Sequence, residues 1–284
     1  MALSLDQENY FSEQASRDYM SVSQFKEFAG TTEHLSCEET AWLQLNRIIP
    51  KQEGDALLIG SFVDAYYEGT LDEFKSNHPE IISSQGPTKG MLKKDFIGAD
   101  SIIQRLEKDA LFSQYMSGQK QLIMTAVIFG CEWKVKMDAF HPQDKIVDLK
   151  VMKDMLPIWS GKRKVDFVHY WGYDIQGAIY QKVVEIVTGY RLPFYLCVAT
   201  KQATTDFEII QISQAHLDEA LDFVAQNLPR VLQIKNDILT PSRCGICSHC
   251  IETKKLENPI QLDDIMPRRF IKEPENEGLE LMDE

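Results

Sequence analysis

Apolar residues follow two periods along the chain, and each period predicts a different element. A helical spacing predicts helices over 55–75, 100–115, 173–188 and 213–234, with shorter helices near 20–28 and after Cys37. Short β-rich or alternating runs predict strands over 122–129, 133–140, 146–150, 194–200 and 207–212. The order of these elements predicts an α/β fold with a mixed central sheet flanked by helices.

The segments between these elements are rich in turn-forming or polar residues. Prolines and glycines predict a loop over 76–100, and residues 151–171 are expected to form a loop and a short helix. Residues 1–20 are polar, with Tyr10 and Phe11 as anchors. Gly60 interrupts an apolar stripe and is expected to mark close packing, whereas Gly189 is expected to cap a helix.

Two carboxylates and one ammonium group lie in the hairpin expected over 136–150. Asp138 lies near the end of the first strand, and Asp148 and Lys150 lie two residues apart on the second. Alternation along a strand places Asp148 and Lys150 on the same face. Burial of such charges is costly without a compensating ion, and Mg²⁺ is commonly bound by one or two carboxylates. The alternative is a surface hairpin with a solvated charged face.

A second pair of acids lies on the helix expected over 55–75. Asp64 and Glu68 are four residues apart and therefore share a helix face. Two like charges at this spacing repel unless they face water or share a cation. An exposed acidic face and a shared cation both remain open for this pair.

Three cysteines near the end of the chain have the spacing of metal ligands. Cys244, Cys247 and Cys250 are separated by two residues each and can face one ion from a tight turn. His249 is adjacent to Cys250 and poorly placed for the same ion, so Cys37 is the leading candidate for a fourth ligand. Zn²⁺ and an iron–sulfur cluster both accept thiolates, and free surface thiols are the weaker alternative.

Charge limits the kinds of nucleic-acid contact that the chain can make. The 284 residues carry a net charge of −13, which argues against a broad nucleic-acid-binding surface. Contacts with DNA would need local basic patches, for which there are two candidates: Lys89, Lys93 and Lys94, and Lys162, Arg163 and Lys164. Solvated surface lysines are the alternative.

No apolar run is long enough to cross a membrane, and no signal peptide is recognised, so a cytoplasmic location is expected.

Taken together, these motifs resemble the PD-(D/E)XK nuclease superfamily over roughly residues 20–256. The similarity is greatest to the group of exodeoxyribonuclease VIII (RecE-like), lambda-exonuclease and RecB-like nucleases. Asp138, followed by Asp148-Leu149-Lys150, resembles the acid…acid-x-Lys signature of the superfamily. Gln176 and Tyr180 resemble the Q-x-x-x-Y motif of RecB-like nucleases. Asp64 lies where many relatives carry the histidine of Gly-x-x-x-His.

The resemblance implies a restriction-endonuclease-like domain over 1–256, with a cysteine-bound C-terminal segment. Within it, N-terminal helices are expected over 20–50, the catalytic core over 55–235 and the cysteine segment over 241–256. Residues 257–284 are expected to form a flexible acidic tail. Some RecB-type and CRISPR adaptation nucleases bind a [4Fe–4S] cluster through one cysteine before the core and three after it. Cys37, Cys244, Cys247 and Cys250 match this arrangement, with Zn²⁺ as the alternative.

The activity implied by the resemblance is metal-dependent exonuclease cleavage at duplex DNA ends, in phage or prophage-type recombination or repair. Asp138, Asp148 and the Leu149 carbonyl would bind Mg²⁺ or Mn²⁺, with Asp64 as a further ligand and Glu68 as its alternate. Lys150 would orient the attacking water or stabilise the developing pentavalent charge, and Gln176 and Tyr180 would position Lys150 or a phosphate.

The family also suggests partners and leaves other functions open. A single-strand annealing protein is an implied partner, and toroidal homo-oligomers occur in the group. One alternative is a non-catalytic DNA- or protein-binding module on the same fold, stapled by a metal cluster. A second is a zinc-ribbon scaffold in which only the cysteines matter. The complete set of two acids and a lysine favours the nuclease.

Overall fold

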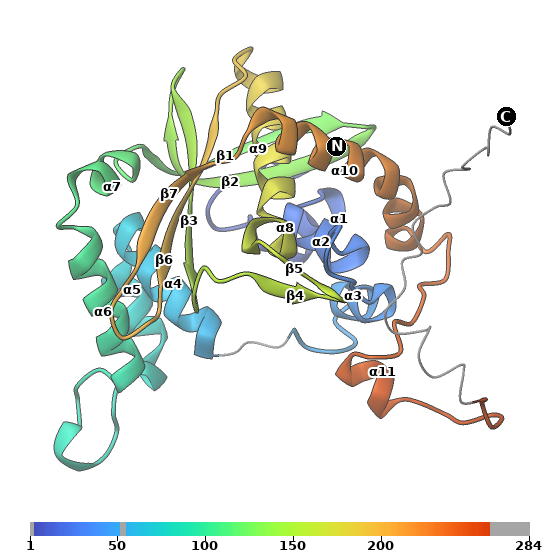
Figure 1. Ribbon diagram of the computed structural model, residues 1–284, viewed down its shortest axis with the longest axis horizontal. Coiled ribbons are helices and arrows are strands. Elements are labelled where there is room, and N and C mark those ends of the chain that lie inside the picture. Colours follow the sequence, from blue (N-terminus) through green and yellow to red (C-terminus); the bar gives the residue numbers. More distant parts are fainter. Residues whose placement is uncertain (1–2, 52–54, 262–284) are drawn as a thin grey trace, which may run out of the picture.

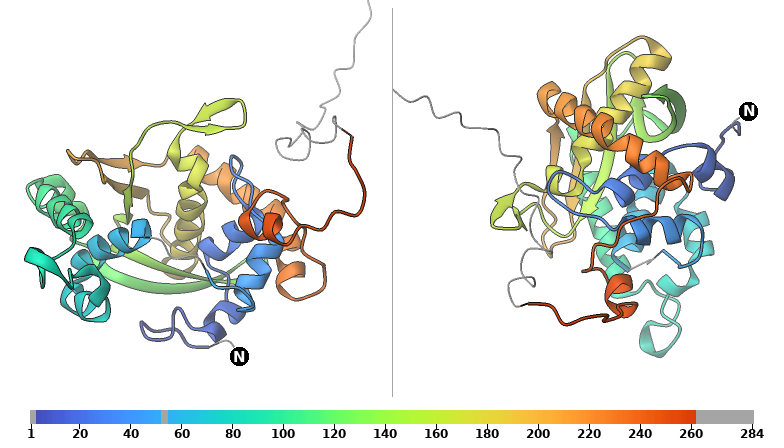
Figure 2. Two further views of the ribbon diagram at one scale, coloured as in Figure 1. Left: turned by 90° about the horizontal axis from the view of Figure 1, so that it is seen from below. Right: turned by 90° about the vertical axis from the view of Figure 1, so that its right-hand side faces the viewer.

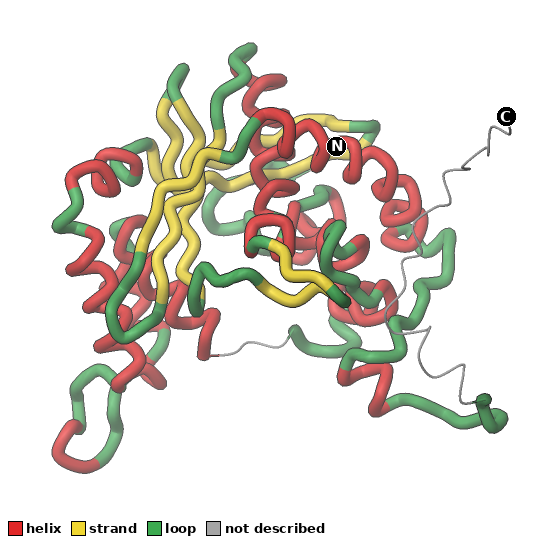
Figure 3. Tube along the Cα trace, in the orientation of Figure 1, coloured by secondary structure: helices red, strands yellow, loops and turns green. Residues whose placement is uncertain are grey.

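The fold is built on a mixed five-stranded sheet with the order β1-β2-β3-β6-β7 (Figures 1 and 3). The computed structural model describes residues 3–51 and 55–261. The sheet strands are β1 Gln119–Ile128, β2 Cys131–His141, β3 Lys145–Met152, β6 Phe194–Thr200 and β7 Phe207–Gln211. Only β3 and β6 are parallel neighbours; the other neighbouring pairs are antiparallel. The expected mixed α/β architecture is therefore confirmed.

Helices cover both faces of this sheet (Figure 2). In the first half they are α1 Glu13–Asp18, α2 Val22–Ala29, α3 Glu38–Leu45, α4 Asp55–Glu68, α5 Leu71–Asn77, α6 Lys94–Leu106 and α7 Ala110–Tyr115, with short 3₁₀ turns η1 Pro79–Ile81 and η2 Gly86–Thr88. In the second half they are α8 Phe167–Trp171, α9 Tyr173–Thr188, α10 Gln214–Lys235 and α11 Ser248–Glu252. A separate two-stranded hairpin consists of β4 Ile158–Ser160 and β5 Arg163–Val165.

The two faces of the sheet bury separate hydrophobic cores. Helices α2, α9 and α10 enclose one core with Trp133 and Ile146 of the sheet. Helices α4, α6 and α7 enclose the other with Val147 and Leu149. Because side chains alternate along β3, Asp148 and Lys150 lie on the same face as Ile146, toward α9.

Several element boundaries differ from those expected from the sequence. The helix expected over 55–75 breaks at Gly69, whose φ of +80° begins a turn between α4 and α5. The loop expected over 76–100 ends early because α6 begins at Lys94. The helix expected over 100–115 is divided, because the Asp109 side chain caps a new helix, α7.

Several elements had not been expected at all, among them helix α1 and the hairpin β4–β5. Helix α1 lies in the polar N-terminal stretch, where the Ser12 side chain caps it through the Ala15 N–H. The hairpin β4–β5 lies within 151–171, and its strands of three residues are too short to show a clear alternation. Most of the expected acidic tail, from residue 262 onward, lies outside the described residues. Within the described part of the chain, no helix combines the length and apolar character needed to cross a membrane.

Close helix packing occurs at Gly177 rather than at Gly60. A Cβ atom added at Gly177 would lie 2.6 Å from Phe194 Cδ1 and 2.8 Å from Leu217 Cδ2. Gly177 therefore allows α9 to approach both β6 and α10. A Cβ atom added at Gly60 would meet nothing within 4 Å, so the expected close packing there is wrong.

These two glycines predict opposite effects of substitution by alanine. Gly177→Ala is expected to lower the free energy of unfolding by roughly 1–3 kcal/mol, because the added methyl group overpacks the core. Gly60→Ala in α4 is expected to raise it by roughly 0.5–1 kcal/mol, because alanine favours a helix. Urea unfolding of both variants measures the difference. A Gly177→Ala protein as stable as the wild type would contradict the proposed packing constraint.

Candidate active site

The candidate active site lies where strands β2 and β3 diverge. The two strands pair only from Ala139–Val147 to His141–Lys145, next to their connecting turn. Beyond this point the Leu149 N–H donates instead to Asp138 Oδ2, at 2.8 Å. In an extended strand the N–H and C=O of one residue point to the same side, so the Leu149 carbonyl also faces Asp138. The gap between the strands thus brings a carboxylate and a backbone carbonyl together.

Asp148 is buried beside Asp138 and is bound from two sides. Its side chain is 2% exposed, with Lys150 Nζ 2.5 Å from Oδ2. Gln176 on α9 donates from Nε2 to Oδ1 at 2.5 Å. The lysine is a charged partner on the same strand, and the glutamine amide fixes the orientation of the carboxylate. Asp148 and Lys150 therefore share one face, as expected.

Tyr180 makes its contact with the neighbouring strand. Its hydroxyl donates to the Lys136 carbonyl of β2 at 3.0 Å. Lys150 is contacted by Asp148 and lies 5.5 Å from the ring centroid of Tyr173. Gln176 therefore contacts Asp148 and Tyr180 contacts β2, while the role expected for both, positioning Lys150 or a phosphate, remains a prediction.

Asp64 approaches the acids from α4, on the opposite side of the sheet. Asp64, Glu68, Gln121, Asp138 and Leu149 line one small pocket. Gln121 has a φ of +51° and donates to Asp138 Oδ1 at 3.2 Å. The gap in the sheet thus allows side chains from both faces to meet, and it unites Asp64 with the two strand acids.

Burial and neighbouring charges shift the pKa values of the ionisable groups in this cluster. Burial raises the pKa of Asp148 to about 7, although Lys150 acts in the opposite direction. Burial and the Asp138 charge raise the pKa of Asp64 well above its usual range. Burial alone would lower the pKa of Lys150, but the Asp148 and Asp138 carboxylates raise it above its usual value. Burial also raises the pKa of Glu68, against the opposing effect of Lys136.

This donor set fits a hard divalent cation. Asp64, Asp138 and Asp148 offer carboxylate oxygens and Leu149 a carbonyl oxygen, the ligand type that Mg²⁺ and Mn²⁺ prefer. A bound cation would stabilise the ionised forms of Asp64 and Asp148, whose pKa values are raised by burial and by the neighbouring carboxylates.

Asp64, Glu68 and Asp138 line a cleft of about 1650 Å³ that also carries several basic side chains. Its lining includes Lys26, Lys134, Lys136 and Lys150 but neither basic patch expected from the sequence. Burial lowers the pKa values of Lys26 and Lys134 to about 8. Lys134 and Lys136 alternate with apolar residues along β2, a pattern that is visible in the sequence. Lys26 had no comparable signal, because its partner, the Trp171 carbonyl at 2.8 Å, is 145 residues away.

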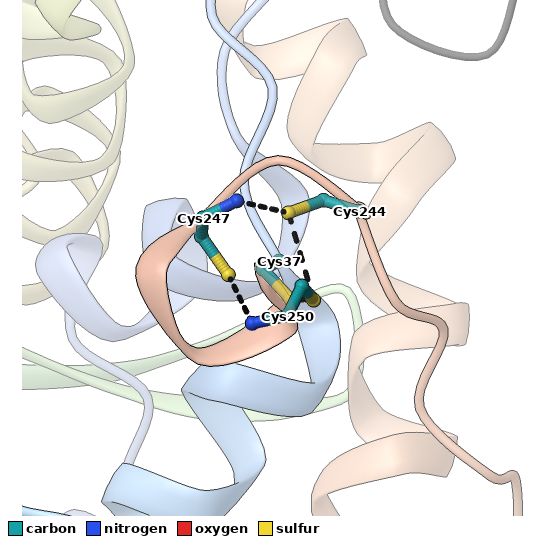
Figure 4. A group of neighbouring side chains, drawn as sticks. All are labelled: Cys37, Cys244, Cys247 and Cys250. Carbon is teal, nitrogen blue, oxygen red and sulfur yellow. Dashed lines mark hydrogen bonds between the residues drawn. The ribbon is translucent and has the colours of Figure 1, made fainter. Parts of the chain in front are cut away.

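Four cysteines form a second cluster, between α3 and α11 (Figure 4). The Sγ atoms of Cys37, Cys244, Cys247 and Cys250 all lie within 4.8 Å of one another. Cys37 precedes α3, and the other three come from the segment around α11. The structure therefore brings the candidate fourth ligand to the triplet. The other two cysteines, Cys131 and Cys197, are buried in the core, as expected.

The distances between the sulfur atoms correspond to a single metal ion. Cys37 Sγ lies 3.6 Å from Cys250 Sγ, which lies 3.9 Å from Cys244 Sγ. A tetrahedral ion with zinc–sulfur bonds of about 2.3 Å holds its sulfurs about 3.8 Å apart. A [4Fe–4S] cluster attaches each thiolate to a different iron and so requires wider spacing.

Hydrogen bonds around the sulfurs favour the thiolate form of one cysteine. The Cys250 N–H and the Thr40 hydroxyl contact Cys247 Sγ at 3.5 and 3.3 Å. Burial would raise the pKa of Cys247, but these hydrogen bonds lower it to about 6. His249 Nε2 lies 3.2 Å from Glu39 Oε2, which agrees with its expected absence from the ligand set.

Comparison with known proteins identifies the family. The family model described as "PDDEXK-like domain of unknown function (DUF3799)" matches residues 21–253. The chain belongs to this PDDEXK-like family. A solved structure from Eubacterium rectale, named "Putative exonuclease", is 46% identical, with a TM-score of 0.87, and the match covers 93% of this chain and 99% of that chain.

The remaining comparisons add no functional argument. A solved structure named SSO0001 is 12% identical, with a TM-score of 0.31, and the match covers 82% of this chain and 95% of that chain. The comparison with curated proteins finds no match. The predicted membership of the PD-(D/E)XK superfamily is confirmed by the family match, whereas the roles of individual residues in this PDDEXK-like chain remain predictions.

Because Asp148 is buried, we expect the free energy of unfolding to depend on pH when divalent cations are chelated. Its folded-state pKa of about 7 exceeds the usual 3.8, so the folded chain retains a proton that the unfolded chain has lost. The resulting stabilisation is present at low pH and is lost as the pH rises through 7. Between about pH 6 and pH 8, the free energy of unfolding should fall by about 1 kcal/mol from this group.

Urea unfolding in a chelator, compared between the wild type and Asp148→Asn, isolates this contribution. The decline should be smaller in Asp148→Asn by that amount, because asparagine does not titrate. The exposed Asp222 on α10 provides the matched control, and Asp222→Asn should behave as the wild type. An identical decline in Asp148→Asn would show that Asp148 does not hold the proton.

Proposed function

We propose that the chain is a metal-dependent nuclease that hydrolyses DNA phosphodiester bonds. The observation that carries this proposal is the group of Asp64, Asp138, Asp148 and Lys150 at the gap between β2 and β3, beside a cleft whose lining includes further lysines. Membership of the PDDEXK-like family supports a nuclease. The anionic phosphates of DNA would be attracted by Lys26, Lys134 and Lys136 despite the negative net charge.

The side chains divide the chemistry between them. Asp138, Asp148, the Leu149 carbonyl and Asp64 would hold Mg²⁺ or Mn²⁺, with Glu68 as the alternate to Asp64. When bound, such a cation supplies polarisation of the phosphoryl oxygen and a lower pKa for a bound water. Gln176 fixes the Asp148 carboxylate by its hydrogen bond to Oδ1. Tyr180 fixes β2 through the Lys136 carbonyl.

Lys150 is the cationic group of the site. Asp148 and Asp138 keep its ammonium protonated at neutral pH by raising its pKa. Its Nζ can therefore donate hydrogen bonds to the attacking water or to the phosphoryl oxygens, where negative charge develops. Its ion pair with Asp148 holds the ammonium beside the carboxylates before substrate binds.

We further propose that the chain is an exonuclease acting at duplex DNA ends. The relative named "Putative exonuclease", at 46% identity, supports this choice. A role in phage-type recombination or repair, a single-strand annealing partner and a homo-oligomer are parts of the same hypothesis. The alternative, a non-catalytic binding module, requires the charged residues to be retained without a reaction.

Loss of one metal-binding carboxylate should abolish cleavage. Asp148→Asn is expected to lower the Mg²⁺-dependent cleavage rate of linear duplex DNA by roughly 100- to 1000-fold, because loss of the carboxylate would raise the activation free energy by several kcal/mol. Asp222→Asn serves as the control and should cleave as the wild type. Near-wild-type cleavage by Asp148→Asn would contradict the proposed site. Equal cleavage of closed circular DNA by the wild type would contradict the exonuclease assignment alone.

For the cysteine cluster we propose one structural Zn²⁺ ion. The sulfur spacing supports zinc, the alternative to the [4Fe–4S] cluster that the family resemblance implies. Four cysteine ligands leave no open coordination position, which is typical of a structural zinc site. The ion would connect the segment before α3 with the segment around α11.

Metal analysis tests this assignment directly. The purified protein is expected to be colourless and to contain about one zinc ion per chain. Cys37→Ser should lose the ion and unfold at a lower temperature, whereas Cys131→Ala should keep the ion, because Cys131 lies outside the cluster. A brown protein containing iron would establish the cluster instead.

A further inference from the structure

An exposed tryptophan lies on the hairpin β4–β5, outside the catalytic cleft. Trp159 is 63% exposed, and Lys164 Nζ lies 5.4 Å from its ring centroid. Lys162 occupies the turn beside them, between the strand ends Ser160 and Arg163. Figure 2 shows this hairpin projecting from the body of the fold. A large aromatic ring among basic side chains is a typical surface for nucleic-acid bases and phosphates.

A second exposed tryptophan lies at the end of α8. Trp171 is 44% exposed, and its ring is edge-on to Tyr170, with centroids 4.8 Å apart. The His34 ring lies 6.2 Å from it. Aromatic neighbours hold the indole ring in place, so stacking a base on it would cost little conformational entropy. We call Trp159, Lys164 and Trp171 the aromatic–basic patch.

One loop holds both parts of the patch. The Ser160 hydroxyl donates to the Glu33 carbonyl at 2.8 Å, and Arg163 pairs with the Glu33 carboxylate at 2.5 Å. The Thr31 hydroxyl donates to the Tyr170 carbonyl at 3.2 Å. The hairpin and α8 are therefore both attached to residues 31–33. The ion pair also neutralises Glu33, a carboxylate that would otherwise repel phosphates.

The patch and the candidate active site are linked through Lys26, which lines the cleft. Lys26 Nζ donates to the Trp171 carbonyl at 2.8 Å and lies 5.5 Å from the Tyr173 ring centroid. Lys150 Nζ lies 5.5 Å from the same ring. The Tyr173 ring is thus near both Lys150 and Lys26, the residue that contacts Trp171. A strand bound at Lys150 would meet the patch directly beyond Lys26.

We propose that the aromatic–basic patch binds single-stranded DNA continuous with the strand in the active site. Unpaired bases stack on Trp159 and Trp171, and Lys164 and Lys162 contact the backbone phosphates. Bases within a duplex are already stacked on each other, so the patch selects an unpaired segment. This inference rests on the proposed nuclease function and adds the form of DNA that the site receives.

Tryptophan fluorescence provides a test that does not depend on cleavage. The chain has four tryptophans; Trp133 is fully buried and Trp42 is partly buried on α3. Titration with oligothymidylate in a chelator should quench the fluorescence of the wild type. Most of this quenching should disappear in Trp159→Phe/Trp171→Phe and persist in Trp42→Phe, the matched control.

Affinity measurements complete the test. Trp159→Ala/Trp171→Ala should bind oligothymidylate roughly 10- to 100-fold more weakly, as expected for lost base stacking. Because both side chains are exposed, the variant should keep the wild-type melting temperature. Wild-type affinity in this folded variant would overturn the proposal. An equal loss of affinity for a blunt duplex would overturn the selection of single strands.

The active-site assignment is tested separately by Asp148→Asn. This variant should lose cleavage and still show quenching by oligothymidylate. Quenching together with a wild type that cleaves no DNA would refute the nuclease and leave the patch in place. Cleavage without quenching would refute the patch and leave the nuclease in place.

Discussion

The structure depends on one hydrogen bond between β2 and β3. In this bond a side-chain carboxylate takes the place of the backbone carbonyl that would normally accept in an antiparallel pair. The Asp138 carboxylate accepts the Leu149 N–H that an antiparallel neighbour would otherwise bind. This satisfies a buried donor while the strands separate, which would otherwise leave backbone groups unpaired. The separation creates room for Asp148, whose burial is tolerated because Lys150 and Gln176 bind its oxygens.

Helices on both sides of the sheet place side chains at this gap. Gly177 allows α9 to approach the sheet closely enough for Gln176 to reach Asp148. From the other side, α4 brings Asp64 and Glu68 to the same pocket. Packing and chemistry are therefore linked, because a shift of either helix would move an oxygen donor. The two separate cores keep these helices fixed against opposite faces.

Much of this arrangement could be predicted from local sequence patterns, because those patterns reflect the sheet itself. Alternation along β3 predicted that Asp148 and Lys150 share a face, and the apolar run over 194–200 predicted β6. Patterns within one segment could not reveal contacts that join distant segments. Lys26 reaches Trp171, and Asp138 reaches Leu149, through backbone atoms that any residue would supply. The hairpin β4–β5 was missed because its short strands are held in place by the loop at Glu33.

The distance along the chain between Cys37 and its partners has a consequence for biosynthesis. Cys37 and Cys250 are separated by 213 residues and lie on opposite sides of the nuclease core in the sequence. At typical translation rates of about 5–20 residues per second, Cys37 would leave the ribosome about 10–40 s before its partners. The four cysteines can therefore come together only after the strands β2 and β3 have been synthesised. Ion capture by the proposed site would then follow synthesis of the sheet, and a nascent chain that ends before Cys244 would lack three of the four thiolates.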